Sequence, residues 1–281
     1  VSEDQTLGVY GVDFVGRRFY TLRVRDLATG EDLGDLIADV TGNTAWASDN
    51  KTLFYTKQDP VTLRSYQIYR HTLGTPVSED VLVYQEDDET FSCGVYKTKS
   101  RKYVVIGARQ TLSDESRYIP ANDPAAEPVV FAARKRGHEY DIDHYGDYFY
   151  IRTNRDAKNF RLMRAKPGHT ATEDWEEVVP HRPDTLLEAF ELFKDYLVLS
   201  DRREGLARLR VIPWDGSPPH EVDFGETAYE AGPGMNPEAD TTTLRYGYTS
   251  MTTPSSVYDY GMVTREKTLI KREEVLGGFD P

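Results

Sequence analysis

The chain has 281 residues, a net charge of −13 and 19 tyrosines among a hydrophobic fraction of 38%. This charge would repel a phosphate backbone, so we expect no nucleic-acid partner. No apolar run approaches the roughly 20 residues that cross a bilayer, and we expect no membrane partner either. Cys93 is the only cysteine, which excludes an intramolecular disulfide and is compatible with a cytoplasmic location.

One short strand that begins on an apolar or aromatic residue recurs along the chain. Its copies begin 45 to 50 residues apart: Leu7–Tyr10, Leu53–Thr56, Tyr103–Ile106, Tyr148–Ile151, Tyr196–Leu199 and Leu244–Gly247. Each copy is followed by a polar loop, a second strand, a turn that usually carries Gly or Pro, and a third strand. There is room for one more strand before the next copy.

Four short strands in each 45 to 50 residues predict an all-β fold, a β-propeller of four-stranded antiparallel blades. We expect one propeller domain over 1–281, with blade units near 1–33, 34–86, 87–134, 135–182, 183–227 and 228–275. A β-sandwich also strings short strands between turns, but it has no reason to repeat at a fixed length. Six units either close as a ring or form about six blades of a seven-bladed propeller.

Motifs for covalent chemistry are missing from this sequence. No serine has glycine two residues before and two after it, as a nucleophile elbow requires; the nearest string, Gly247-Tyr248-Thr249-Ser250-Met251, has the wrong spacing. The six histidines lack the helical spacing of a zinc enzyme. We therefore assign no catalytic residue, metal or cofactor, and expect the histidines to be structural or exposed.

Several strings resemble the oligopeptidases B of the prolyl oligopeptidase family, along the whole chain. They include Tyr66-Gln67-Ile68-Tyr69-Arg70-His71, His138-Glu139-Tyr140, Asn154-Arg155, Leu244-Arg245-Tyr246-Gly247-Tyr248 and Ser250-Met251-Thr252-Thr253-Pro254. The resemblance implies a seven-bladed propeller that caps an α/β-hydrolase domain of the same polypeptide. It also implies a serine peptidase that cuts short basic peptides after Arg or Lys. By this resemblance the chain begins inside the second blade and stops about where the hydrolase domain would start.

Acidic residues recur just before or within the predicted innermost strand of four units: Glu89, Glu139, Glu188 and Glu230. Inner strands run in the same direction along the channel of a propeller, so equivalent positions would form a ring at one level. Such a ring would concentrate cationic peptides in the channel, which suits substrates that carry Arg or Lys. The alternative is that these are solvated or salt-bridged carboxylates at strand ends.

Arginines in predicted loops give a second candidate set: Arg17, Arg18, Arg155 and Arg182. Loops at one end of a propeller would face the hydrolase domain, and an arginine can hold a carboxylate there with two parallel hydrogen bonds. The resemblance supports Arg18 most, because the paired arginine is typical of the family. The alternative is a solvated loop arginine.

The sequence thus favours a propeller that gates access to the active site of a serine peptidase. A free-standing propeller that binds a protein partner is the alternative, although WD and kelch signatures are absent. A propeller glycosidase is a third interpretation, and it would need two channel carboxylates at catalytic separation.

Overall fold

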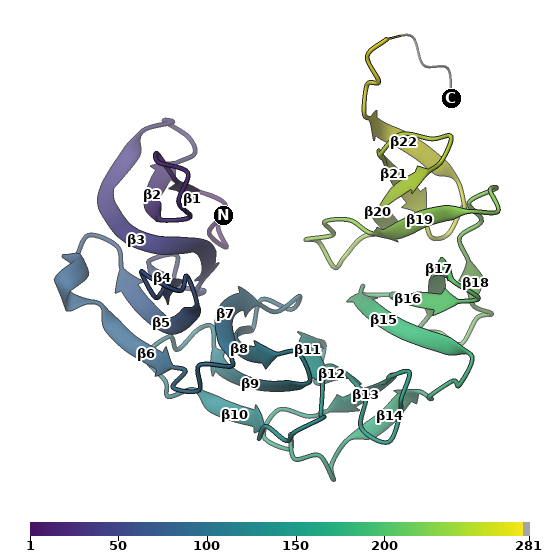
Figure 1. Ribbon diagram of the computed structural model, residues 1–281, viewed down its shortest axis with the longest axis horizontal. Coiled ribbons are helices and arrows are strands. Elements are labelled where there is room, and N and C mark those ends of the chain that lie inside the picture. The colour runs from purple at the N-terminus through teal and green to yellow at the C-terminus, as the bar shows by residue number, and fades with distance from the viewer. Residues whose placement is uncertain (278–281) are drawn as a thin grey trace. The chain divides into compact units, whose positions relative to one another are not determined.

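The computed structural model describes residues 1–277, and its regular elements are β-strands apart from the 3-10 turn η1 (Val77–Glu79) (Figure 1). Within these residues the strands form five antiparallel sheets, the blades of a β-propeller. The first sheet has six strands in chain order: β1 (Leu7–Val12), β2 (Tyr20–Asp26), β3 (Asp32–Trp46), β4 (Thr52–Gln58), β5 (Ser65–Thr72) and β6 (Val81–Gln85).

The other four sheets have four strands each, and consecutive strands lie side by side. The second sheet contains β7 (Ser92–Lys97), β8 (Tyr103–Gln110), β9 (Ser113–Pro120) and β10 (Val129–Ala132). The third contains β11 (Tyr140–Tyr145), β12 (Tyr148–Thr153), β13 (Arg161–Ala165) and β14 (Glu176–Val179). The fourth contains β15 (Thr185–Leu192), β16 (Tyr196–Arg203), β17 (Leu206–Pro213) and β18 (His220–Glu221). The fifth contains β19 (Tyr229–Pro233), β20 (Thr243–Ser250), β21 (Ser256–Gly261) and β22 (Lys267–Arg272).

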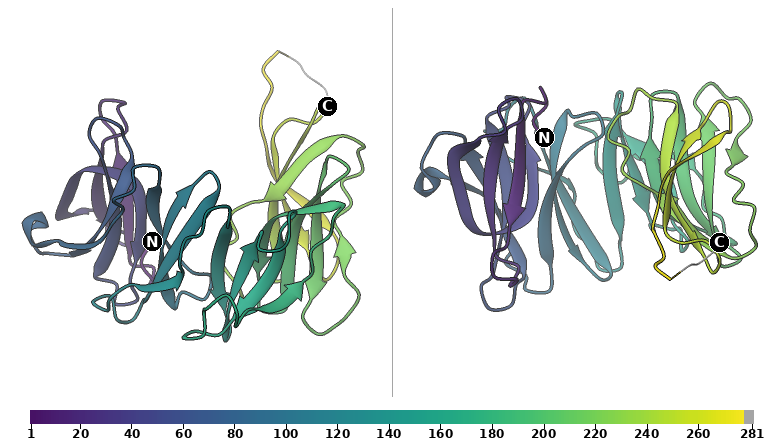
Figure 2. Two further views of the ribbon diagram at one scale, coloured as in Figure 1. Left: turned by 60° about the horizontal axis from the view of Figure 1, so that its bottom comes forward. Right: turned by 90° about the horizontal axis from the view of Figure 1, so that it is seen from above.

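The chain forms two compact units. The first unit consists of Val1–His144 together with Pro167–Asp174, and the second consists of Tyr145–Lys166 together with the residues from Trp175 onward. The right-hand view of Figure 2 shows the strands of the first unit side-on, in purple to teal, with turns gathered at both of their ends.

The number of blades differs from the prediction. The predicted boundary between the first two units, at residues 33 and 34, falls inside β3, which is one continuous strand (Figure 1). Val40 pairs with Tyr20 of β2 on one side and with Lys57 of β4 on the other. Because β3 belongs to both ladders, the first two predicted units share one sheet. The prediction of about six blades of a seven-bladed propeller is wrong: the described residues form five, one of them six-stranded.

The burial of a strand depends on its position in the blade. The second strand of a blade has a neighbour on each side and packing on both faces, so it needs a continuous apolar run rather than alternation. In β8 the five residues Val104–Ala108 are all buried, and in β16 the apolar run Leu197–Leu199 is buried likewise. The outer strand β22 is exposed along its whole length.

Apolar clusters between successive sheets form the core of each unit. In the first unit, Phe54 and Ile68 of the first sheet pack with Val95, Val104 and Ile106 of the second. In the second unit, the fourth and fifth sheets pack through one cluster of buried side chains: Phe193, Val198, Leu209, Val211, Val222, Ala231, Leu244, Tyr246, Tyr248, Tyr260 and Met262. Fully burying one such side chain stabilises the fold by about 1.5–3 kcal/mol, so these clusters hold the blades side by side. No helix in residues 1–277 is long and apolar enough to cross a membrane.

Candidate functional site

Loops at one end of the strands of the first unit include the one that carries Arg17 and Arg18, two of the four predicted arginines. These are the loops 13–19, 59–64 and 86–91, which we call the arginine-loop end. Gln58, at the end of β4, donates from Nε2 to the carbonyl oxygen of Arg18 at 2.6 Å. Arg64 donates from Nη1 to the carbonyl oxygens of Glu86, Asp88 and Phe91 at 3.2, 3.3 and 2.9 Å. These bonds fix the three loops against one another.

Arg17 and Arg18 are exposed in the loop between β1 and β2. The Asp13 carboxylate accepts hydrogen bonds from the backbone N–H groups of Val15, Gly16 and Arg18, at 3.0, 2.8 and 2.6 Å. Arg18 has a left-handed φ of 64°, so the loop turns sharply at this residue. Among the described residues neither guanidinium of the pair forms an ion pair, and both stand on a loop whose backbone is held in place.

Arg155 and Arg182 lie in the second unit, in the loops 154–160 and 180–184. The two loops adjoin, because Asn159 donates from Nδ2 to the carbonyl oxygens of Arg182 and Pro183 at 3.2 and 2.8 Å. Arg155 lies 4.0 Å from Asp156, and Arg182 lies 3.2 Å from Asp184. Both ion pairs are exposed, so each adds at most about 1 kcal/mol to stability.

The four predicted acidic residues occupy different positions relative to their inner strands. Glu89 is exposed in the loop before β7, and Glu139 is half-buried immediately before β11. Glu188 lies inside β15, and Glu230 is the second residue of β19. Within the second unit, the structure brings Glu188 and Glu230 together.

Arg202, which the sequence analysis did not single out, joins Glu188 and Glu230. Its Nε lies 2.6 Å from Glu188 Oε1, and its Nη2 lies 2.9 Å from Glu230 Oε1. These hydrogen bonds, to Glu230 and then Glu188, raise the pKa of the Arg202 guanidinium. The three side chains carry a net charge of −1, so this part of the acidic set attracts cations less than two unpaired carboxylates would.

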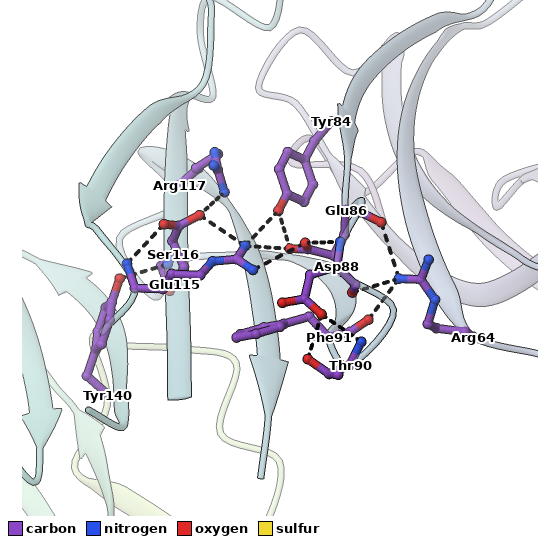
Figure 3. Close-up of polar contacts among 11 residues, drawn as sticks. Arg64, Tyr84, Glu86, Asp88, Thr90, Phe91, Glu115, Ser116, Arg117 and Tyr140 are labelled. Atoms are coloured by element: carbon purple, nitrogen blue, oxygen red, sulfur yellow. Dashed lines mark hydrogen bonds and ion pairs between the residues drawn. The ribbon is translucent and has the colours of Figure 1, made fainter. Parts of the chain in front are cut away.

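A buried charge network in the first unit was also missed by the sequence analysis. Figure 3 shows Tyr84, Glu86 and Glu115 around a guanidinium, which belongs to Arg134, and Arg117 beside the carboxylate of Glu115. Arg134 Nη2 lies 2.6 Å from Glu86 Oε2 and 3.3 Å from Glu115 Oε1. The carboxyl side chains of Glu86 and Glu115 are only 4% and 8% exposed.

Both buried carboxyl groups stay ionised because of their partners. Burial pushes the pKa of Glu86 upward, but hydrogen bonds from Arg134 and Tyr84 outweigh it and lower this pKa. The same balance holds for Glu115, whose carboxylate also accepts the backbone N–H of Arg134 at 3.0 Å. The network ties the loops 86–91 and 133–139 together and thereby stabilises the arginine-loop end.

A second buried cluster surrounds His71 of β5, whose ring has no exposed surface. Its Nδ1 lies 2.7 Å from Asp80 Oδ1, and its Nε2 lies 3.1 Å from Asp35 Oδ1. Tyr55 donates to the other oxygen of Asp80 at 2.8 Å, and the Gly74 N–H donates to Asp35 at 2.6 Å. Every group in this cluster already has a partner, so its geometry indicates a structural role.

Metal ligation finds no support in the described part of the chain: residues 1–277 contain no group of three His, Cys, Asp or Glu side chains that could hold an ion. The buried thiol of Cys93 is also a poor ligand or nucleophile, because burial raises its pKa to about 12.

Comparisons with known proteins identify the family of this fold. Residues 1–273 match the family described as prolyl oligopeptidase, N-terminal beta-propeller domain. A dipeptidyl aminopeptidase BI of Pseudoxanthomonas mexicana is 43% identical over 99% of this chain and 38% of its own length. Oligopeptidase B of Leishmania major, a solved structure, is 28% identical with a TM-score of 0.89, over 98% of this chain and 40% of that one.

Oligopeptidase B of Trypanosoma brucei, solved with covalently bound antipain, is 27% identical with a TM-score of 0.89, over 99% of this chain and 40% of that one. The chain therefore spans about two fifths of the length of the relatives that it matches. In these relatives the propeller is one part of a longer peptidase. The match over nearly the whole chain shows that it belongs to the N-terminal β-propeller family of the prolyl oligopeptidases.

Proposed function

We propose that this propeller controls access to the active site of an oligopeptidase B-like serine endopeptidase that cleaves short peptides after Arg or Lys. The observation that carries the proposal is the family match over residues 1–273, in a chain that spans about two fifths of its peptidase relatives. The 281 residues contain no nucleophile elbow, so an α/β-hydrolase domain of the same polypeptide would supply catalysis. A cytoplasmic location is part of this proposal.

The acidic residues Glu89, Glu139, Glu188 and Glu230 would attract the basic substrate. Three observations support this role: Glu89 is exposed, Glu139 is half-buried before an inner strand, and Glu188 and Glu230 keep a net charge of −1 together with Arg202. A surface with excess negative charge raises the local concentration of cationic peptides, and salt screens this effect.

Neutralising these four residues to glutamine in the complete peptidase should lower kcat/KM for an N-terminally blocked Arg peptide about tenfold at low salt. High salt should shrink the difference, and a neutral peptide should show little of it. A matched control neutralises four exposed glutamates elsewhere, Glu31, Glu79, Glu266 and Glu273, which changes the net charge equally. Equal losses in both variants would show that these four carboxylates do not attract the substrate.

A second candidate activity is the release of dipeptides from a free N-terminus, because the 43% identical relative is named a dipeptidyl aminopeptidase. The blocked peptide distinguishes the two activities. An endopeptidase cleaves it after Arg, whereas a dipeptidyl aminopeptidase leaves it intact and acts on the unblocked form. A free-standing propeller scaffold would cleave neither peptide.

We also propose that Arg17, Arg18, Arg155 and Arg182 contact carboxylates of the hydrolase domain. Support comes from the exposed guanidinium of Arg18 on a loop that Asp13 and Gln58 hold in place. A rigid loop loses little conformational freedom when such a contact forms.

Arg18→Ala should shift the complete peptidase toward an open form and change kcat/KM by about ten- to a hundredfold, because a hydrogen bond to a charged group contributes about 1.5–3 kcal/mol. Small-angle X-ray scattering and peptide hydrolysis measure the two effects. Arg265→Ala is the matched control, since Arg265 is also an exposed arginine with left-handed φ, at 63°. If both variants behave like the parent protein, Arg18 makes no interdomain contact.

A further inference from the structure

Met251 of the second unit is almost wholly exposed near the tip of a loop. It lies in the loop 251–255 between β20 and β21, and its exposed fraction is 93%. Single exposed apolar residues are common on folded proteins and need no explanation by themselves. Met251 differs from them in two respects: hydrogen bonds hold its loop in place, and the chain leaves the fifth sheet beside that loop.

Side-chain hydrogen bonds fix the backbone of this loop. Ser250 Oγ accepts the N–H groups of Thr252 and Thr253 at 3.2 and 2.9 Å. Glu226, from the loop before β19, accepts the hydroxyl groups of Thr252 and Thr253 at 3.2 and 3.1 Å. Hydrogen bonds from Tyr248 and Ser250 lower the pKa of Glu226, so its carboxylate is ionised near neutral pH and keeps these contacts. The loop is therefore formed before a partner arrives, and it loses little conformational freedom when one binds.

The chain leaves the fifth sheet next to the same loop. β22 is the last strand of that sheet and ends beside the start of β21. The residue after it, Glu273, donates its N–H to the carbonyl oxygen of Ser255 at 2.8 Å. Val275 and Leu276, which follow, carry exposed apolar side chains. A polypeptide that continues from β22 would therefore start beside the loop of Met251.

We propose that Met251 is an apolar anchor for the hydrolase domain of the same polypeptide. The family match describes an N-terminal domain, and the chain spans about two fifths of its relatives, so the remaining part would follow β22. A methionine suits this contact, because its flexible thioether side chain fills irregular apolar gaps. The exposed Val275 and Leu276 would extend the apolar surface. This inference rests on the proposed function and adds an apolar contact to the charged contacts of the arginines.

Oxidation of the complete peptidase with hydrogen peroxide tests the proposal, since each accessible thioether takes one oxygen atom from the peroxide and water is released. Met235 is the matched control, because it is 84% exposed in another loop of the same unit. Mass spectrometry should show Met251 oxidised about tenfold more slowly than Met235 in the folded protein, and equally fast in urea. The buried Met163 and Met262 should stay reduced until the protein unfolds.

Equal oxidation of Met251 and Met235 in the folded peptidase would overturn the proposal. Protection of Met251 that appears only at high protein concentration would overturn it too, because a second copy would then cover the loop. Hydrolysis of the blocked Arg peptide is measured separately. A polypeptide that protects Met251 at every concentration without cleaving this peptide contradicts the proposed function but supports the anchor.

A polar substitution measures what the contact contributes. Met251→Gln in the complete peptidase should lower the ratio of closed to open forms about tenfold, because glutamine has a similar length but gains less from burial. Met235→Gln should leave this ratio unchanged. Small-angle X-ray scattering measures the ratio, and circular dichroism checks that both variants are folded. If both variants match the parent protein, Met251 does not anchor the domain.

Discussion

Replacing His71 with phenylalanine should lower the free energy of unfolding by about 3–5 kcal/mol, which is the usual cost of removing one partner from a buried charge cluster. The imidazole lies between two carboxylates, and a carboxylate can only accept hydrogen bonds. Asp35 and Asp80, only 7% and 2% exposed at their side chains, would then face an apolar ring. Tyr55 and the Gly74 N–H would still donate to them, but both carboxylates would lose their contacts with the imidazole nitrogens.

Urea denaturation followed by tryptophan fluorescence measures this loss, because Trp46 packs in the same sheet beside Leu53 and Tyr55. His169→Phe is the control, since His169 is exposed in a loop and should change stability by less than about 0.5 kcal/mol. Adding Asp35→Asn and Asp80→Asn to His71→Phe should recover part of the lost free energy of unfolding, because the amides replace the two buried carboxylates. If His71→Phe and His169→Phe unfold at the same urea concentration, the cluster contributes no stability.

The positions of strands could be predicted from the sequence where a strand is buried on both faces and its residues are therefore apolar. The predicted strand Tyr103–Ile106 lies within β8, because a strand that is buried on both faces must be apolar.

The number of blades could not be predicted from the sequence, and β3 shows why. Its residues include Gly34, Asp39 and Asn43, which usually mark turns. The strand nevertheless continues through them, with Asp39 at a left-handed φ of 57° and a register shift between Val40 and Thr44.

Asn43 explains how a turn-forming residue is accommodated inside a strand. Its side-chain amide donates to the Val95 carbonyl oxygen at 2.9 Å and accepts the Val95 N–H at 2.7 Å. It thus pairs with β7 of the next sheet as a backbone peptide would. Val95 lies 52 residues away in the sequence, so no local pattern could reveal this pairing.

The candidate site shows the same limit of sequence reasoning. The acidic stretch 86–89 offers four neighbouring carboxylates, and the sequence analysis chose Glu89 from its position before an inner strand. In the structure Glu89 is exposed, whereas Glu86 is buried. What distinguishes Glu86 is its contact with Arg134, which lies 48 residues later in the chain. Arg202 was missed for the same reason, because its contacts with Glu188 and Glu230 span 14 and 28 residues.

Arg134→Met should lower the free energy of unfolding by about 3–5 kcal/mol, an effect comparable with that of His71→Phe. Methionine fills a similar volume but leaves the buried Glu86 without a cation, whereas Glu115 keeps Arg117 at 2.7 Å. The variant also loses the contact of the guanidinium with the Phe91 ring, whose centroid lies 4.1 Å away. Because Arg134 joins the loops 86–91 and 133–139, amide hydrogen exchange should speed up in these loops before the sheets unfold.

The matched control is Arg164→Met, which breaks an exposed ion pair with Glu176 and should cost less than about 1 kcal/mol. The loss has two contributions: the buried carboxylates that lose Arg134, and the lost packing of the guanidinium against Phe91. The triple variant Arg134→Met, Glu86→Gln, Glu115→Gln separates them, because it removes the buried carboxylate charges but does not restore the packing. We expect it to unfold at a higher urea concentration than Arg134→Met alone, because a buried charge without a partner costs more than a neutral polar group. If the triple variant is no more stable than Arg134→Met, the loss comes from packing against Phe91 rather than from the buried carboxylates.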